Sequence, residues 1–142
     1  MTEKYFVDSN VWLYLFTEDD SRKKVSAESF LDERTGRETL FISWQIINEV
    51  WANLLRKGQS DKTARKMIEH MLRSCELVDF SYDLIVAANN LRASHSVSFW
   101  DSLVVAAAQA ADCDILVSED MQDGKRFGTL RVKNIFTSPD TQ

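Results

Sequence analysis

The chain opens with a short apolar strand that ends in an acidic residue, Lys4-Tyr5-Phe6-Val7-Asp8. A second apolar segment of this kind, residues 114–118, leads into Glu119-Asp120. Residues 40–43 and 76–80 also have strand composition, and a weaker strand is expected near residues 130–132. Short, nearly continuous apolar strands are typical of a parallel sheet that is covered on both faces.

Helical patterns lie between these strands. Residues 45–57 and 60–73 place apolar side chains three and four positions apart, as an amphipathic helix does. Gly58 is the expected C-terminal stop of the first helix, and residues 82–93 and 99–111 are read as two further helices. Alternation of strands and helices predicts an α/β fold in which helices flank a central, mostly parallel sheet.

The composition indicates one compact domain. The chain has 142 residues, of which 44% are hydrophobic and a single one is proline. This length suits one domain covering residues 1–142, and the hydrophobic fraction is that of a globular rather than a disordered protein. The longest apolar stretches, residues 11–16 and 103–108, are too short to span a membrane.

The N-terminus and the cysteines predict a cytoplasmic protein. Met1-Thr2-Glu3-Lys4 lacks the charged-then-apolar layout of a signal peptide. Cys75 and Cys113 are the only cysteines, and we expect two buried thiols in a reducing compartment rather than a disulfide.

The net charge of −5 does not indicate a protein that binds nucleic acid through the electrostatic field of its whole surface. The basic residues are nevertheless clustered. Two interpretations of the clusters remain open: solvated helix faces and loop ends, or contacts to phosphates around an acidic site. The clusters are Arg22-Lys23-Lys24, Arg56-Lys57, Lys62 with Arg65-Lys66, and Lys125-Arg126.

Four acidic residues fall at one edge of the predicted sheet. Asp8 and Asp120 follow strands, whereas Asp101 lies in the first turn of a helix and Glu49 in the first or second turn of another. Crossover helices begin at the carboxyl edge of a parallel sheet, which is where such sheets bind ligands. Clustered carboxylates repel one another unless a cation lies between them, and Mg²⁺ or Mn²⁺ prefers oxygen ligands. The sequence therefore predicts a divalent-metal site at this edge.

Each acid also has a purely structural interpretation. Asp8 suits the cap of a helix that begins at Ser9 or Asn10, and Ser98-Phe99-Trp100-Asp101 resembles a capping box. Glu49 borders an apolar stripe and should be partly buried, and Asp120 lies in a polar turn. The common edge favours the metal site, because four independent caps need not converge.

Other kinds of site find little support. His70 and His95 have no partner at zinc-ligand spacing, and Ser102 and Ser118 have no evident histidine for a nucleophilic triad. The sequence contains neither a Walker loop nor G-x-G-x-x-G. Aromatic-rich segments, such as the one around Trp100, are more typical of a core or a subunit interface than of stacking on bases.

Four segments resemble the motifs of PIN-domain ribonucleases, in the same order. Phe6-Val7-Asp8-Ser9-Asn10-Val11-Trp12-Leu13-Tyr14 resembles the opening strand and turn. The three later motifs are matched by Ser43 with Asn48-Glu49, by Phe99-Trp100-Asp101-Ser102-Leu103-Val104-Val105-Ala106-Ala107-Ala108, and by Leu116-Val117-Ser118-Glu119-Asp120-Met121-Gln122-Asp123-Gly124. Length and coverage resemble the VapC-type toxins of bacterial toxin–antitoxin modules.

The resemblance implies a PIN-like three-layer sandwich that cleaves RNA with a divalent metal, Mg²⁺ or Mn²⁺, held by Asp8, Glu49, Asp101 and Asp120. Asn10 and Ser118 match polar positions that the family places beside the acids. Asp123 is either a further acid near the metal or a turn residue. A VapB-type antitoxin and a homodimer are the implied protein partners.

Three other functions remain open at this point. A PIN-type nuclease could process RNA without an antitoxin. A haloacid-dehalogenase-like phosphatase would use Asp8 as its nucleophile, but that chemistry wants a second acid where Asn10 stands. A binding module without catalysis would have no need to gather four repelling carboxylates. Which carboxylate accepts a proton from the attacking water is not assigned by the sequence.

Overall fold

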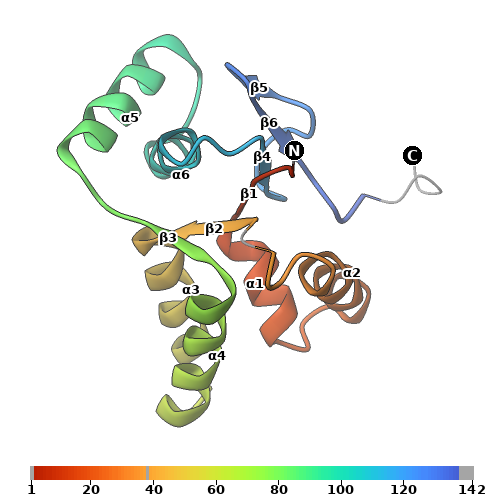
Figure 1. Ribbon diagram of the computed structural model, residues 1–142. Helices are drawn as coiled ribbons and strands as arrows, with labels where there is room; N and C mark the ends of the chain where they lie inside the picture. The colour runs from red at the N-terminus through yellow and green to blue at the C-terminus, as the bar shows by residue number, and fades with distance from the viewer. Residues whose placement is uncertain (1, 38, 138–142) are drawn as a thin grey trace.

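The computed structural model describes residues 2–37 and 39–137 and has one central sheet (Figure 1). The strands lie in the order β3-β2-β1-β4-β6-β5. All neighbours pair in parallel except β5 and β6. The strands are β1 (Tyr5–Val7), β2 (Leu40–Ser43), β3 (Glu76–Val78), β4 (Ile115–Val117), β5 (Arg126–Phe127) and β6 (Leu130–Lys133).

Helices cover both faces of this sheet, which confirms the predicted three-layer α/β sandwich (Figure 1). One side carries α1 (Ser9–Phe16), α2 (Ser21–Asp32), α3 (Trp44–Arg56) and α4 (Asp61–Ser74). The other side carries α5 (Tyr82–Ser94) and α6 (Phe99–Ala110), with α6 next to the strands and α5 packed on α6.

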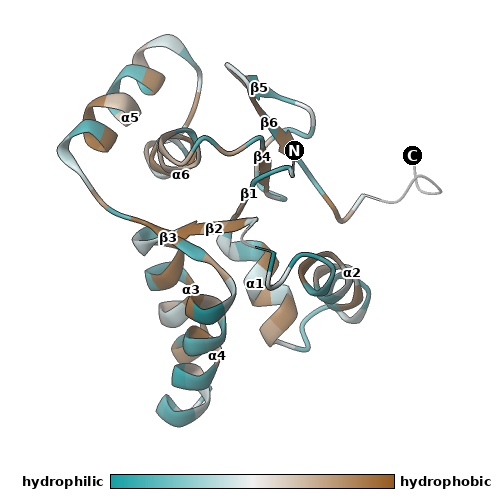
Figure 2. Ribbon diagram, in the orientation of Figure 1, coloured by the Kyte–Doolittle hydropathy of each residue, from teal (hydrophilic) through white to brown (hydrophobic). Residues whose placement is uncertain are grey.

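The core is densest around β1 and β4, whose residues are buried along the whole strand. In α6, every residue from Ser102 to Ala108 is buried, which the run Leu-Val-Val-Ala-Ala-Ala makes possible because small side chains let the helix approach the sheet. Figure 2 shows the strands as a hydrophobic centre between more polar outer helices.

The pairing of β1 on both sides positions the candidate site. Tyr5 is in register with Leu40 of β2 and with Ile115 of β4, so the three strands end at the same edge. Helix α1 starts directly after β1, and α3 directly after β2. The loop after β4 begins at Ser118. The segments that leave this carboxyl edge therefore carry three of the predicted acids, Asp8, Glu49 and Asp120.

The predicted elements agree with the structure, with two omissions. Each of the five expected strands and the four expected helices is present, with ends that differ by no more than two residues. Helix α2 was not expected, because only Ala27, Phe30 and Leu31 are buried and its polar residues hide the helical period. The two-residue strand β5 is too short to leave a pattern.

Local signals at the helix ends behave as expected. Gly58 has φ +92°, and the N–H groups of Gly58 and Gln59 donate to the carbonyls of Leu55 and Leu54, which is a Schellman ending for α3. Cys75 and Cys113 are both free; Cys113 is buried as expected, whereas Cys75 is only partly buried. Among the described residues, no helix combines the length and hydrophobicity that a membrane crossing requires.

Candidate active site

Asp8 is the buried centre of the site. It caps α1 by accepting the N–H of Ser9 on Oδ1 at 2.8 Å, as the capping interpretation of this residue predicted. Its other oxygen, Oδ2, accepts the Ser118 hydroxyl at 2.7 Å. Only 4% of Asp8 is exposed to solvent. The carboxylate is thus held by two donors, one from the segment that follows β1 and one from the segment that follows β4.

Asn10 connects Asp8 with Asp120. Its side-chain amide donates to Asp120 Oδ2 at 3.1 Å and more weakly to Asp8 Oδ2 at 3.5 Å. Its oxygen accepts the backbone N–H of Glu119 at 3.3 Å. Ser118 supports the same turn, because its Oγ accepts the N–H of Asp120 at 3.2 Å. Asn10 and Ser118 therefore lie beside the acids, where the sequence predicted them.

Glu49 approaches Asp8 from the second turn of α3. Its Oε2 accepts the Ser9 hydroxyl at 3.1 Å, and its Oε1 accepts the Gln45 amide at 2.8 Å. Gln45 also donates to the backbone oxygen of Trp100 at 3.3 Å, which ties α3 to the start of α6. Glu49 is half-buried, as expected for a residue at the border of the apolar stripe.

Asp101 lies in the first turn of α6. The helix is capped by Ser98, whose hydroxyl accepts the N–H of Asp101 at 3.1 Å. This bond uses the backbone of Asp101 and leaves its carboxylate available. Asp101 and Asp120 line one hollow of about 260 Å³, together with Lys125.

The charges of the acids act on one another. The pKa of Asp8 is raised to about 6, chiefly by burial and in addition by the nearby charges of Glu49 and Asp120, while the hydrogen bonds from Ser118 and Ser9 lower it in part. Burial also raises the pKa of Asp101, and the charge of Asp120 adds to this effect. The mutual repulsion therefore runs from Glu49 through Asp8 and Asp120 to Asp101.

The donor set fits a hard divalent cation, although it does not enclose one. Within residues 2–37 and 39–137, no three His, Cys, Asp or Glu side chains are grouped closely enough to hold a metal by themselves. Mg²⁺ keeps several waters and is commonly bound through one or two carboxylates. Four carboxylates suit that mode of binding, because the buried Asp8 among them is ionised at a cost that a bound cation would offset.

The hydrogen bond that Asp123 forms is with a residue outside the acidic cluster. Its carboxylate accepts the backbone N–H of Asn134 at 2.9 Å and so joins the turn after β4 to the segment after β6. Of the two expectations for Asp123, the turn role is the one that its observed contact supports.

Ser9 and Gln45 were not assigned a role from the sequence. Ser9 lies between Asp8 and Asn10 in the first motif. Its backbone N–H donates to Asp8, and its hydroxyl reaches Glu49 only because α1 and α3 pack together. Gln45 precedes Glu49 by one helical turn, and this i to i+4 spacing is the signal that could have identified it.

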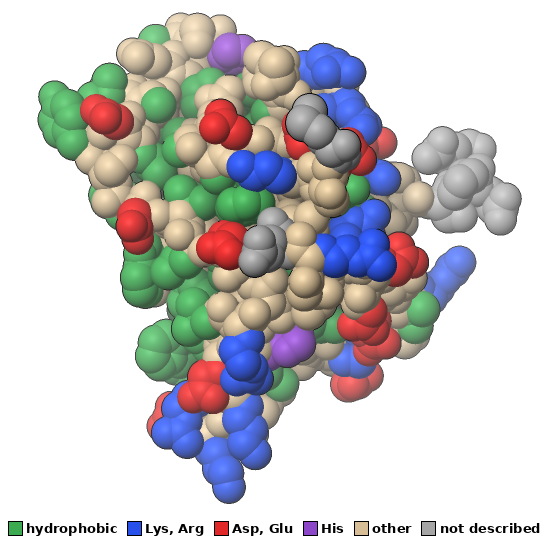
Figure 3. Space-filling model, viewed as in Figure 1, with side chains coloured by type: hydrophobic (Ala, Val, Ile, Leu, Met, Phe, Trp, Pro, Cys, Tyr) green, Lys and Arg blue, Asp and Glu red, His purple; other side chains and the backbone are tan. Residues whose placement is uncertain are grey.

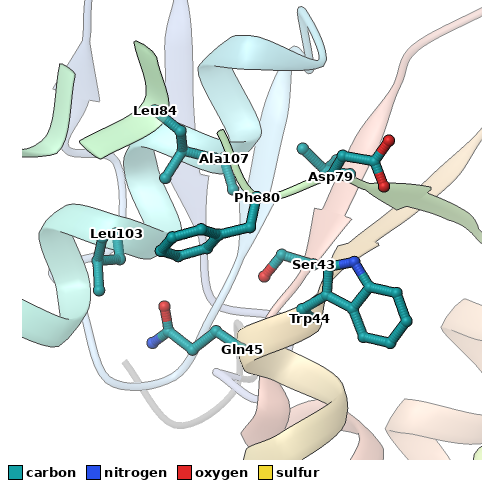
Figure 4. A pocket seen from close by; sticks show the side chains of 9 residues that line it. Ser43, Trp44, Gln45, Asp79, Phe80, Leu84, Leu103 and Ala107 are labelled. Carbon is teal, nitrogen blue, oxygen red and sulfur yellow. The ribbon is translucent and has the colours of Figure 1, made fainter. Parts of the chain in front are cut away.

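The side chain of Ser43, next to the site, makes no hydrogen bond in the described part of the chain. Ser43 is the N-cap residue of α3 and is buried. Figure 4 shows the hydroxyl directed into a small void between Phe80 and Gln45. The void measures about 10 Å³, close to the space one water molecule needs.

A second, larger hollow flanks the acids on the side of Glu49. It has a volume of about 600 Å³ and runs along one face of α3, from Gln45 through Glu49 to Arg56. Its opposite wall is aromatic and is formed by exposed side chains. We call this hollow the aromatic groove; its aromatic members are Trp44, Phe80, Phe99 and Trp100.

Comparison with known proteins gives one family match. Residues 5–124 match the family model described as PIN domain. A search of curated proteins found no match.

Solved structures of similar fold include toxins and toxin–antitoxin complexes. VapC20 of Mycobacterium tuberculosis, described as a sarcin-ricin loop cleaving toxin, is 19% identical over 80% of this chain and 87% of its own, with a TM-score of 0.66. A chain of the DNA-bound VapBC complex of Salmonella typhimurium is 14% identical over 94% and 99%, with a TM-score of 0.70. A chain of VapBC2 from Rickettsia felis, bound to promoter DNA, is 19% identical over 92% and 97%, with a TM-score of 0.66. At these identities the likeness establishes the fold.

The elevated pKa of Asp8 predicts how the metal-free protein responds to pH. Because the folded-state pKa of about 6 exceeds the ordinary 3.8, ionisation of Asp8 costs the folded state about 3 kcal/mol, and stability is lost as the pH rises from about 4 through 6. Asp8→Asn should therefore be more stable than wild type at pH 7.5, by up to about 3 kcal/mol, and similar to it at pH 4.

Urea unfolding of both proteins in EDTA at the two pH values measures this difference. Asp112→Asn is the matched control, because Asp112 is exposed at the opposite, amino edge of β4. A variant less stable than wild type at pH 7.5 would show that the capping role of the Asp8 carboxylate outweighs its repulsion.

Proposed function

Because this chain belongs to the PIN-domain family, we propose that it is a divalent-metal-dependent endoribonuclease that acts as the toxin of a toxin–antitoxin pair. The observation that carries the proposal is the buried Asp8, which lies within electrostatic reach of Glu49 and Asp120 at the carboxyl edge of the sheet. A fold without a cation or substrate to bind gains nothing from burying a carboxylate among others. The likeness to VapC chains supports the toxin role.

The four carboxylates, Asp8, Glu49, Asp101 and Asp120, are the residues that would hold Mg²⁺ or Mn²⁺. Such an ion, when bound, supplies an activated water and neutralises charge on the scissile phosphate. Ser118 and Ser9 fix the orientation of Asp8 through their hydrogen bonds. Asn10 holds Asp120 beside Asp8, and Gln45 orients Glu49 toward them. These neutral donors set the positions of the oxygens before the ion arrives.

The competing functions are less well supported. A phosphatase that uses Asp8 as nucleophile needs an acid near position 10, whereas Asn10 donates its amide to the site and the family match is to PIN domains. An RNA-processing nuclease without an antitoxin uses the same site chemistry. A gene for a short DNA-binding protein beside this one would favour the toxin over that alternative.

We further infer that residues 1–142 act as one PIN domain and that the site of action is the cytoplasm, where an RNA substrate is found. The exposed apolar side chains of α3 and α5 support a homodimer. Figure 3 shows hydrophobic side chains gathered along the left edge of the molecule, over these two helices. The exposed apolar residues of the two helices include Trp51 and Leu55 on α3 and Tyr82 and Val86 on α5.

Cleavage of RNA is the direct test of the proposed function. We expect the purified protein to cut single-stranded RNA in Mg²⁺ or Mn²⁺, to lose activity in EDTA, and to regain it when metal is restored. Asp101→Asn should lower kcat at least about 100-fold, because it removes a ligand charge from the site. Activity is followed by gel electrophoresis of a labelled transcript.

Two controls guard the interpretation of this test. Asp112→Asn makes the same chemical change at the opposite edge of the sheet and should retain activity. Thermal melts should show Asp101→Asn folded, since the Ser98 cap bond uses the backbone N–H of Asp101. Undiminished cleavage by metal-free protein in chelator would refute the mechanism.

An antitoxin is expected to inhibit by placing a cation among the carboxylates. An Arg or Lys side chain can satisfy Asp8, Glu49, Asp101 and Asp120 in place of a metal ion, and apolar residues of the same segment would pack in the aromatic groove. Raising Mg²⁺ should weaken inhibition by an isolated antitoxin peptide, and replacing its basic residue should weaken it more. Equal inhibition without any basic residue, at every Mg²⁺ concentration, would place the block elsewhere.

The homodimer predicts a solution mass of twice the 16.3 kDa chain at micromolar concentration. Trp51→Glu should shift the mass toward the monomer, because the change puts a charge into an apolar interface. Val25→Glu is the matched control, since Val25 is an exposed apolar residue on α2, away from α3 and α5. Light scattering measures all three proteins, and a monomeric wild type would contradict the prediction.

A further inference from the structure

The hairpin formed by α3 and α4 concentrates positive charge at its tip. Residues 56–66 contain five basic residues and one acidic residue, although the whole chain has a net charge of −5. The Schellman turn at Gly58 brings the end of α3 next to the start of α4 and so joins clusters that are separate in the sequence. We call this the basic tip; its cations are Arg56, Lys57, Lys62, Arg65 and Lys66.

Most of this charge is not neutralised within the described part of the chain. Lys57 pairs with Asp19, and Arg65 approaches Glu69 at 3.8 Å on the exposed face of α4. The Arg56 guanidinium donates to the neutral Asn53 side chain at 2.7 Å. Among the described residues, Lys62 and Lys66 form no salt bridge. Figure 3 shows Lys and Arg side chains gathered at the lower end of the molecule, where Figure 1 places the hairpin.

The aromatic groove connects the basic tip to the acidic site. Glu49 and Arg56 both line it, from positions two turns apart on the same face of α3. They are seven residues apart, which corresponds to about 10 Å along the helix. A strand whose scissile phosphate lies at the carboxylates therefore has its neighbouring phosphates within reach of Arg56, where the basic tip begins.

We propose that the basic tip binds the phosphate backbone of the RNA strand, a few nucleotides from the bond that the acidic site cleaves. This inference rests on the proposed ribonuclease function and extends it to how the substrate is held. An acidic protein repels a polyanion over most of its surface, so its substrate has to be retained by local cations. The basic tip supplies such cations on the α3–α4 hairpin, whose first helix carries Glu49.

The salt dependence of RNA binding tests this proposal. The probe is a fluorescein-labelled, single-stranded oligoribonucleotide of mixed sequence, and the protein carries Asp8→Asn so that the RNA stays intact. Adding Lys62→Gln and Lys66→Gln should raise Kd and reduce the slope of log Kd against log salt by about 1.4, since each phosphate contact to a single strand contributes about 0.7. Both substitutions keep good helix formers on the exposed surface of α4.

Arg37→Gln in the same background is the matched control. Arg37 is exposed in the hollow beside Tyr5 and Thr39, at the amino edge of the sheet, and its loss should leave the slope unchanged. In the otherwise wild-type enzyme, Lys62→Gln with Lys66→Gln should raise KM and preserve kcat. Light scattering confirms that the oligomeric state is the same in every variant.

The outcomes separate this inference from the proposed function. If wild type cleaves RNA but the Lys62 and Lys66 changes leave the slope unaltered, the basic tip does not hold the substrate. If those changes weaken only the complex with a co-purified acidic protein, the tip is a protein-binding surface and the inference is wrong. If the slope falls as expected but no metal restores cleavage, RNA binding by the tip stands and the nuclease function fails.

Discussion

The site depends on one constraint, the parallel pairing of β1 between β2 and β4. Tyr5 is in register with Leu40 on one side and Ile115 on the other, so three strands end together. Hydrogen bonding on both sides leaves β1 no freedom to slip, and a shift by one residue would turn its buried side chains to the opposite face. Asp8, Ser43 and Ser118, the residues that follow or end these strands, are consequently fixed relative to one another.

The same constraint forces an unfavourable electrostatic arrangement. Asp8 is buried, and the charges of Glu49 and Asp120 oppose its ionisation. The fold offsets this cost with neutral donors, which stabilise the carboxylate without cancelling its charge: the Ser9 N–H, the Ser118 hydroxyl and the Asn10 amide. A basic residue in their place would neutralise the acids permanently, and the carboxylates would then be unable to bind a metal ion.

Lys125 shares a hollow with Asp101 and Asp120, but on the side of Glu49 the basic residues are kept at a distance. The α3–α4 hairpin carries Glu49 near one end and the basic tip at the other, with the aromatic groove between them. One rigid helix, α3, thereby sets the separation of the two charges at about 10 Å. Acidic and basic surfaces that lie this close would neutralise each other if side chains could bridge them, and the helical spacing prevents that contact.

The sequence by itself determined the layer order, five of the strands, four of the helices and the common edge of Asp8, Glu49, Asp101 and Asp120, because periodicity and chain alternation are local signals. It could not reveal α2 or β5, whose stability comes from packing and from pairing with β6. Only the tertiary structure decided that Ser9 links Asp8 to Glu49, that Asp123 binds the backbone of Asn134, and that the aromatic groove leads to the basic tip. Such contacts join residues far apart in the chain, and their distances depend on how helices pack rather than on any local preference.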